Sequence, residues 1–227
     1  MNGKDTLVLT GTSMAVYAVS RAGQGRYPSA ILLAVVVGLV LFFTRLYVPL
    51  MLLTSLLAAL LLAPARRKRP ALWLLVPLGL AVVLSALGIH GLADAYSRLQ
   101  AEFVNPLYGV IRMALTPIPF HTTKHYAFLD LPQVFHWAMM PALVYGVVRV
   151  WRRATLTARF VVVYFLLMIL LYGMFDALQG PRHRLQLDCL IALFQFYGAL
   201  GLLRQMVPPA RNVPRLRQPT VPEGTRS

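Results

Sequence analysis

Long apolar runs separated by short cationic connections dominate this chain. A helix needs about 20 apolar residues to cross the roughly 30 Å hydrocarbon core of a bilayer, and somewhat fewer where its ends lie at the interface. Six runs meet this condition: 29–43, 47–63, 72–89, 134–148, 160–178 and 187–203. Because backbone groups that face lipid must pair within their own segment, each run is expected to be an α-helix. The pattern predicts an all-α, polytopic transmembrane bundle over residues 1–206.

A seventh run, residues 7–20, is short and less apolar. It carries Thr10, Thr12 and Ser13, so it is a marginal span. The run lacks the small-residue cleavage site of a secretory signal peptide, and we interpret it as part of the folded chain.

The composition supports a membrane protein and argues against a nucleic-acid partner. Hydrophobic residues make up 58% of the 227-residue chain, and the mean hydropathy is +0.66. Both values exceed those of ordinary soluble domains. The net charge of +15 arises from short Lys and Arg clusters between apolar runs, a pattern typical of membrane-protein connections.

The distribution of these cations predicts the orientation. Four regions hold 15 of the 22 Lys and Arg residues: the connections at 21–26, 66–69 and 149–159, and the chain after Leu203. The positive-inside rule places these regions, including the C-terminus, in the cytoplasm. The N-terminus is outside if residues 7–20 span the membrane. All five histidines and six of the seven acidic residues then fall on or near the outer side.

Two regions are expected to lie outside the spans. Residues 90–133 form an outer loop, in which Asp94, Arg98 and Glu102 repeat at intervals of four on an amphipathic helix. A second short segment, 107–115, carries Arg112, and the whole loop is expected to lie along the interface. The tail, 207–227, is rich in Pro and Arg and is expected to be disordered and cytoplasmic.

The most distinctive polar stretch is 180–188, between the last two apolar runs. Arg182, His183 and Arg184 follow a Gly-Pro pair and precede a helix, so they are predicted to form a cationic turn at the outer membrane boundary. Guanidinium groups beside a helix entry can bind phosphate through charge-assisted hydrogen bonds. Asp176 and Asp188 bracket the turn and are candidate catalytic bases. Snorkelling of interfacial arginines is the alternative.

Two further arginines are candidate phosphate ligands, whereas no metal or cofactor is expected. Arg45 joins two apolar runs and must reach water, headgroups or a carboxylate, and Arg112 lies in the outer loop.

His121 and His125 lack the further ligands of a zinc site. His136 and Trp137 are interpreted as interfacial anchors, and no nucleotide-binding motif is recognisable.

The stretch Gly180-Pro181-Arg182-His183-Arg184-Leu185-Gln186-Leu187-Asp188 resembles a late turn in bacterial polytopic glycosyltransferases of the GT-C type, which use polyprenyl-phosphate sugars. Segments in the C-terminal halves of membrane proteins from exopolysaccharide and O-antigen clusters are similar to Lys4-Asp5, residues 44–49 and residues 116–120, in this order. The resemblance implies a location in the bacterial inner membrane and a polyprenyl-phosphate lipid as partner. It also implies a role in cell-envelope polysaccharide assembly.

The chain departs from that family in one respect. The catalytic acid of those enzymes lies in the first outer loop of a longer N-terminal half, to which nothing here corresponds. The sequence therefore leaves catalysis open. The alternative function is that of a non-catalytic scaffold or accessory subunit that binds other membrane subunits.

Overall fold

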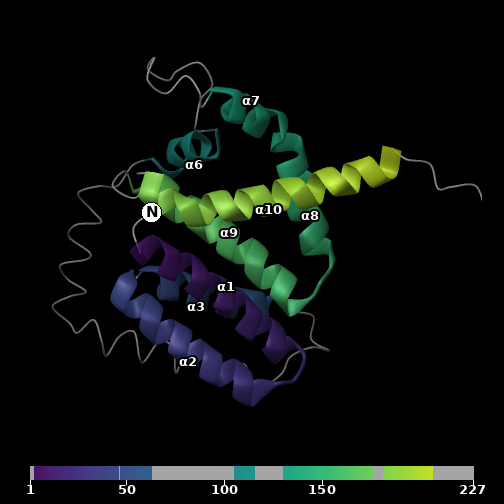
Figure 1. Ribbon diagram of the computed structural model, residues 1–227. Coiled ribbons are helices and arrows are strands. Elements are labelled where there is room, and N and C mark those ends of the chain that lie inside the picture. The colour runs from purple at the N-terminus through teal and green to yellow at the C-terminus, as the bar shows by residue number, and fades with distance from the viewer. Residues whose placement is uncertain (1–2, 46, 63–104, 116–129, 176–180, 207–227) are drawn as a thin grey trace, which may run out of the picture.

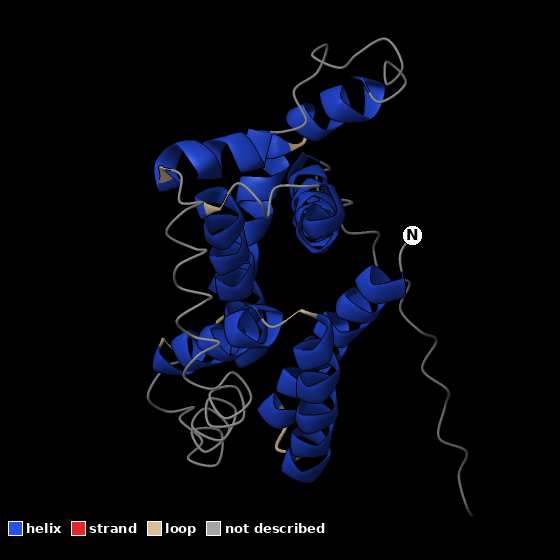
Figure 2. Cartoon of the chain, turned by 90° about the vertical axis from the view of Figure 1, so that its left-hand side faces the viewer, coloured by secondary structure: helices blue, strands red, loops and turns tan. Residues whose placement is uncertain are grey.

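The computed structural model describes residues 3–45, 47–62, 105–115, 130–175 and 181–206. The regular elements of these residues are helices (Figures 1 and 2), which confirms the all-α prediction for this part of the chain. The helices are α1 (Gly3–Gly23), α2 (Tyr27–Thr44), α3 (Tyr47–Leu61), α6 (Pro106–Leu115), α7 (Asp130–Ala138), α8 (Met140–Arg152), α9 (Leu156–Met174) and α10 (Pro181–Met206).

Helices α1, α2, α3 and α9 pack together as neighbours of alternating direction (Figure 1). At one end the cluster contains the close of α1 (Ala22), the start of α2 (Ala30) and the close of α3 (Leu60), with Leu156 of α9 packed against it. At the other end, Asp5 near the start of α1 meets Arg45 at the close of α2. The chain thus runs back and forth between two ends, as expected of a polytopic bundle.

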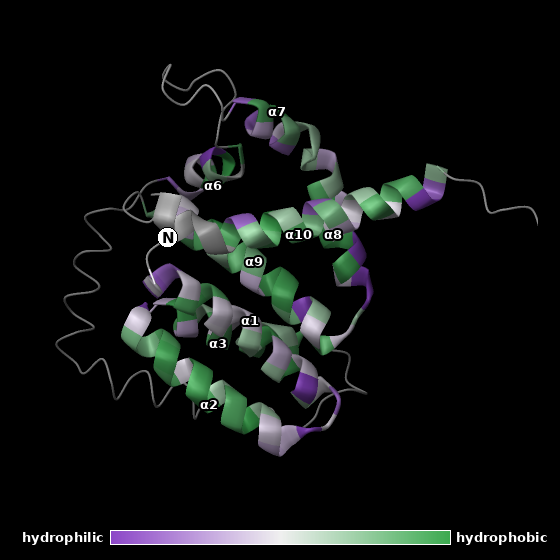
Figure 3. Cartoon of the chain, in the orientation of Figure 1, coloured by the Kyte–Doolittle hydropathy of each residue, from purple (hydrophilic) through white to green (hydrophobic). Residues whose placement is uncertain are grey.

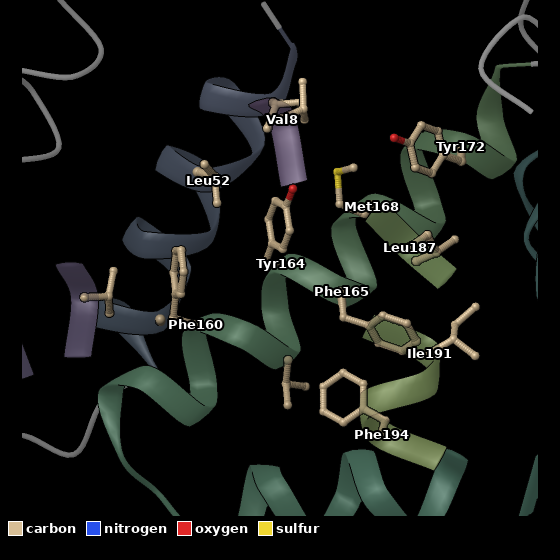
Figure 4. Packing of buried hydrophobic residues seen from close by; sticks show 14 of the residues in the cluster. Val8, Leu52, Phe160, Tyr164, Phe165, Met168, Tyr172, Leu187, Ile191 and Phe194 are labelled. Atoms are coloured by element: carbon tan, nitrogen blue, oxygen red, sulfur yellow. The ribbon is translucent and has the colours of Figure 1, made fainter. Parts of the chain in front are cut away.

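Helix α9 is the centre of the hydrophobic core (Figure 4). Phe160, Tyr164, Met168 and Tyr172 recur every four residues, and all four are almost completely buried. This spacing places them on one face of a helix. Phe165, on a neighbouring face, contacts Phe194 of α10 with ring centroids 4.9 Å apart. Helix α9 therefore joins α10 to the α1–α2–α3 group.

Helix α2 is apolar around much of its circumference (Figure 3). One face packs through Val37 and Leu41, whereas Leu32, Val36 and Phe43 are exposed. Such a helix is typical of a segment whose uncovered face contacts lipid.

Three described helices are long and apolar enough to cross a membrane: α2, α9 and residues Leu187–Met206 of α10. A fourth span is possible if α7 and α8 cross as one bent unit. The chain is thus a multi-pass membrane protein by the length and composition of its helices. The described residues do not show the six strong spans predicted from the sequence. Helix α3 has only 15 residues, and α1, although 21 residues long, is not among the candidate spans.

The run at 134–148, expected to form one spanning helix, is broken at Met139 but can still cross as a bent pair. The structure divides this region into α7 and α8, which are bent by 48°. Pro141 lies in the first turn of α8, where a missing backbone N–H is tolerated, but a proline inside a continuous helix would break its hydrogen-bond ladder. The proline therefore explains why a new helix begins here.

Several predictions concern residues outside the described ranges. These are the span at 72–89, the amphipathic segment with Asp94, Arg98 and Glu102, the histidines His121 and His125, Asp176, and the tail at 207–227. The second segment of the outer loop is described and forms α6. Its start is capped by Asn105, whose Oδ1 accepts a hydrogen bond from the backbone N–H of Leu107 at 3.0 Å.

Candidate functional site

The Arg182-His183-Arg184 sequence belongs to a helix. Helix α10 begins at Pro181, six residues before the predicted start of the last apolar segment. The prediction of a turn is therefore corrected to the first turns of α10. Proline is favoured at the first position of a helix because its missing N–H would have no intrahelical partner there. The backbone N–H groups of this helix start are of the kind that bind anions.

The two candidate bases have different outcomes. Asp188 lies on α10, two turns from its start, and is exposed. Asp176 lies outside the described residues. Only one of the two predicted carboxylates can therefore be placed, and it is on the same helix as the arginine pair.

Arg45 forms an ion pair with Asp5, in which Nη2 of the arginine donates to Oδ1 of the carboxylate. Only 13% of the Arg45 side chain and 9% of the Asp5 side chain are exposed. The backbone of Arg45 ends α2, with its N–H bonded to the carbonyl of Leu41. Of the three destinations considered for this arginine, the structure thus shows the carboxylate.

Two tyrosines extend this ion pair into a polar chain. Nη1 of Arg45 donates to the hydroxyl of Tyr47 at 3.1 Å. That hydroxyl lies 3.5 Å from the hydroxyl of Tyr172, and the two rings meet edge to face. These four polar side chains link the start of α1, the end of α2, the start of α3 and the end of α9. Four helix ends are held by one group of polar side chains.

Helix α6 brings Arg112 to the same end of the bundle. Gly109 of α6 lies against Gly173 of α9 so closely that a Cβ added to Gly109 would be 1.7 Å from the Gly173 carbonyl oxygen. The guanidinium of Arg112, one turn later, lies over the ring of Tyr108, 5.9 Å from its centroid. Arg112 is partly buried.

The predicted ligands Arg45 and Arg112 therefore lie on helices that meet near the end of α9. Arg45 closes α2, Arg112 is on α6, and α10 with Arg182 and Arg184 starts a few residues after the end of α9. The Arg45 guanidinium is already paired with Asp5 and mostly buried. A bound anion would have to compete with the Asp5 carboxylate for its guanidinium.

His136 and Trp137, expected to be interfacial anchors, make specific contacts. The amide nitrogen of buried Gln195 donates to the His136 carbonyl oxygen at 3.2 Å and lies 3.3 Å from the His136 ring nitrogen. Trp137 Nε1 donates to the carbonyl of Leu115 at 2.9 Å. No group of three or more metal-ligating side chains occurs among the residues that the structure describes.

The sequence reasoning missed the pairing of Asp5 with Arg45 and the role of Tyr172. A signal for the pairing was present, because the predicted orientation puts both charged residues on the outer side. Tyr172 offered no comparable signal, since a tyrosine in an apolar run is ordinarily a core residue.

Comparison with known proteins identifies no relatives: no family model, no curated protein and no solved structure matches this chain.

Proposed function

We propose that this multi-pass membrane protein takes part in bacterial cell-envelope polysaccharide assembly, where it holds a polyprenyl-phosphate-linked or polyprenyl-pyrophosphate-linked sugar at the outer face of the inner membrane. The observation that carries the proposal is the start of α10. Arg182, His183 and Arg184 fall within its first turns. A helix N-terminus favours anions through its backbone N–H groups and its dipole, and guanidinium groups add charge-assisted hydrogen bonds.

Each candidate residue has a defined role. Arg182 and Arg184 would bind the phosphate, with His183 beside them and Arg112 contributing positive charge. Arg45 would act mainly by holding the rim of the bundle together, since its guanidinium is bound to Asp5 and Tyr47. Glycosyl transfer would additionally need a base, for which Asp176 and Asp188 are candidates, and the arginines would stabilise the negative charge on the departing phosphate.

The experiment is lipid-linked oligosaccharide profiling in cells whose only copy of the protein carries Arg182→Ala and Arg184→Ala. We expect the lipid-linked intermediate to accumulate. The matched control is Arg204→Ala, which removes an exposed arginine from the last turn of the same helix and should leave the profile unchanged. An unchanged profile in the double variant, at normal protein levels, would reject the proposal.

A non-catalytic scaffold is the second candidate, and the short helices α6 and α7 favour it. They expose large apolar side chains, namely Leu107, Tyr108, Ile111, Leu131, Phe135 and Trp137. Such a surface suits a second membrane subunit as well as the bilayer interface. Purification in mild detergent distinguishes the two functions: a stoichiometric protein partner supports the scaffold, whereas a single protein carrying polyprenyl lipid supports the first proposal.

A further inference from the structure

Two arginines of α8 converge on one aromatic ring of α10. Arg149 and Arg153 are four residues apart, so they lie on one face of the helical turn that closes α8. The Cζ atom of each lies 4.9 Å from the centroid of the Tyr197 ring. The two guanidinium groups are therefore no farther apart than twice this distance. Figure 1 shows α10 passing across α8 in this region.

Close helix packing fixes this arrangement. Gly146 and Gly198 allow the two backbones to touch, because a Cβ on Gly198 would lie 1.9 Å from the carbonyl oxygen of Ala142. Beyond this contact, Nη1 of Arg149 lies over Gly201, where a Cβ would be 2.1 Å away. The absence of a side chain at Gly201 leaves the space through which Arg149 reaches Tyr197.

The positive charge at this point has no counterion in the described part of the chain. Neither the Arg149 nor the Arg153 side chain has an ion pair or a hydrogen bond there, and the Tyr197 hydroxyl is buried without a hydrogen-bond partner. Tyr197 belongs to the candidate span Leu187–Met206. Unbalanced charge near hydrocarbon is costly, so such groups normally find a partner of opposite charge.

The neighbouring start of α9 adds to the positive potential. Its first turn contains no acidic residue, although carboxylates are favoured at this position. Arg159 follows, with its guanidinium 5.7 Å from the ring centroid of Trp151. Nε and one Nη of Arg159 are buried without a hydrogen-bond partner. Figure 3 shows the polar colouring of this connection between α8 and α9.

Apolar side chains flank the arginine pair. Val144 and Val148 of α8 and Leu200 and Leu203 of α10 are exposed. A lipid whose phosphate binds Arg149 and Arg153 could therefore place its hydrocarbon chains against these side chains. Basic pockets between transmembrane helices with this combination are known to bind the headgroups of anionic lipids.

We propose that Arg149, Arg153 and the Tyr197 hydroxyl form a binding site for the phosphate-bearing headgroup of an anionic phospholipid. The two guanidinium groups donate to phosphate oxygens, and the Tyr197 hydroxyl supplies a further donor. Arg153 is exposed, so a headgroup can reach it from outside the protein. Arg149 is half-buried and would bind the same headgroup from the more buried side. This site lies in the predicted cytoplasmic part of the chain, so it is separate from the helix start at Arg182 and does not depend on the proposed function.

The test measures lipid binding by the full chain in detergent, with native mass spectrometry, during titration with phosphatidylglycerol or phosphatidylcholine. Arg149→Gln and Arg153→Gln should each weaken phosphatidylglycerol binding about fivefold, since an arginine near an anionic surface contributes about this much. Phosphatidylcholine binding should change little. The control is Arg152→Gln, which removes the same charge from an exposed neighbour that is not one of the two arginines over the Tyr197 ring and should leave affinity within about twofold.

Tyr197→Phe provides an independent arm, because it keeps the ring on which both arginines lie and removes only the hydroxyl. We expect weaker phosphatidylglycerol binding with unchanged thermal stability. Three results would overturn the proposal: equal losses in the Arg149, Arg152 and Arg153 variants, equal affinity for the two lipids, or displacement of the lipid by millimolar inorganic phosphate. The last result would assign the site to free phosphate.

Discussion

At the scale of single residues, the Asp5–Arg45 pair is the feature with the largest predicted energetic effect. Both side chains are removed from solvent, so the pair is not screened as a surface salt bridge would be. A buried pair gains little net stability over an apolar substitute, but loss of one partner leaves an isolated charge. The pair therefore acts chiefly as a constraint that joins the start of α1 to the end of α2.

Asp5→Asn should destabilise the protein by about 3–5 kcal/mol, because the Arg45 charge would remain buried without its carboxylate. Unfolding in detergent, followed by circular dichroism, measures the change. The double variant Asp5→Asn with Arg45→Met should recover most of the loss, and Lys4→Gln, at an exposed neighbour, should have little effect. A double variant that is less stable than Asp5→Asn alone would contradict this account.

Sequence alone could predict that Arg45 needed a partner, because a cation between two apolar runs must be neutralised or hydrated. The predicted orientation puts Asp5 on the same side but does not distinguish it from the other outer carboxylates, because it is 40 residues away and becomes a neighbour only through the packing of α1 on α2. The start of α10 shows the opposite limitation. A helix can begin before its first apolar residues, at a position that local capping determines. The Gly-Pro pair predicts a turn, whereas Pro181 is the first residue of the helix.

At the scale of elements, small residues determine which helices touch. Gly146 of α8 meets the backbone of α10 at Phe194, and Gly109 of α6 meets the backbone of α9 at Gly173. In lipid, helices associate through close packing and not through a hydrophobic driving force. These glycines are thus the positions at which the contacts of α8 and α6 can be disrupted by a single methyl group.

Gly146→Ala should cost about 1–3 kcal/mol, because its Cβ would lie 2.1 Å from the Phe194 carbonyl oxygen and the helices would have to separate. Gly38→Ala is the matched control. It lies in α2 with no atom within 4 Å of its added Cβ, so it should be neutral or slightly stabilising, as alanine is the better helix former. Similar unfolding midpoints for the two variants in detergent would show that the α8–α10 contact is wrong.

Helix α9 begins with a capped turn that offers a second test at this scale. The Thr155 hydroxyl oxygen accepts a hydrogen bond from the Ala158 backbone N–H at 3.2 Å. Thr155→Ala should therefore cost about 1 kcal/mol of unfolding free energy, and Thr155→Ser should retain the bond. The cap is refuted if the alanine and serine variants have the same stability in detergent unfolding.

At the scale of the whole molecule, apolar patterning was enough to predict the fold class and most of the helix positions. The runs at 29–43, 160–178 and 187–203 correspond to α2, α9 and the apolar part of α10. Patterning was not enough to predict the bend before α8, since Pro141 sits in an otherwise continuous apolar run. It was also insufficient for tertiary placement, such as the crossing of α10 over α8, because contact in lipid depends on shape more than on hydrophobicity.

The helix ends fall into two groups at opposite ends of the bundle. Asp5, Arg45 and Tyr172 lie at one end of the bundle, whereas Ala22, Ala30 and Leu60 lie at the other. The cation count predicts that the first end faces outward. Whether Arg182 and Arg184 can meet a lipid-linked sugar depends on this orientation, since both arginines belong to the helix that starts at that end.

The most direct measurement is the accessibility of a cysteine placed at His183. Cys189, which is exposed, is first replaced by serine, and intact cells are then treated with a membrane-impermeant maleimide. The account predicts labelling at position 183 without permeabilisation, and labelling of a cysteine at Arg204 only after permeabilisation. Labelling of position 183 only after permeabilisation would place the arginine pair on the cytoplasmic side and contradict the proposed function.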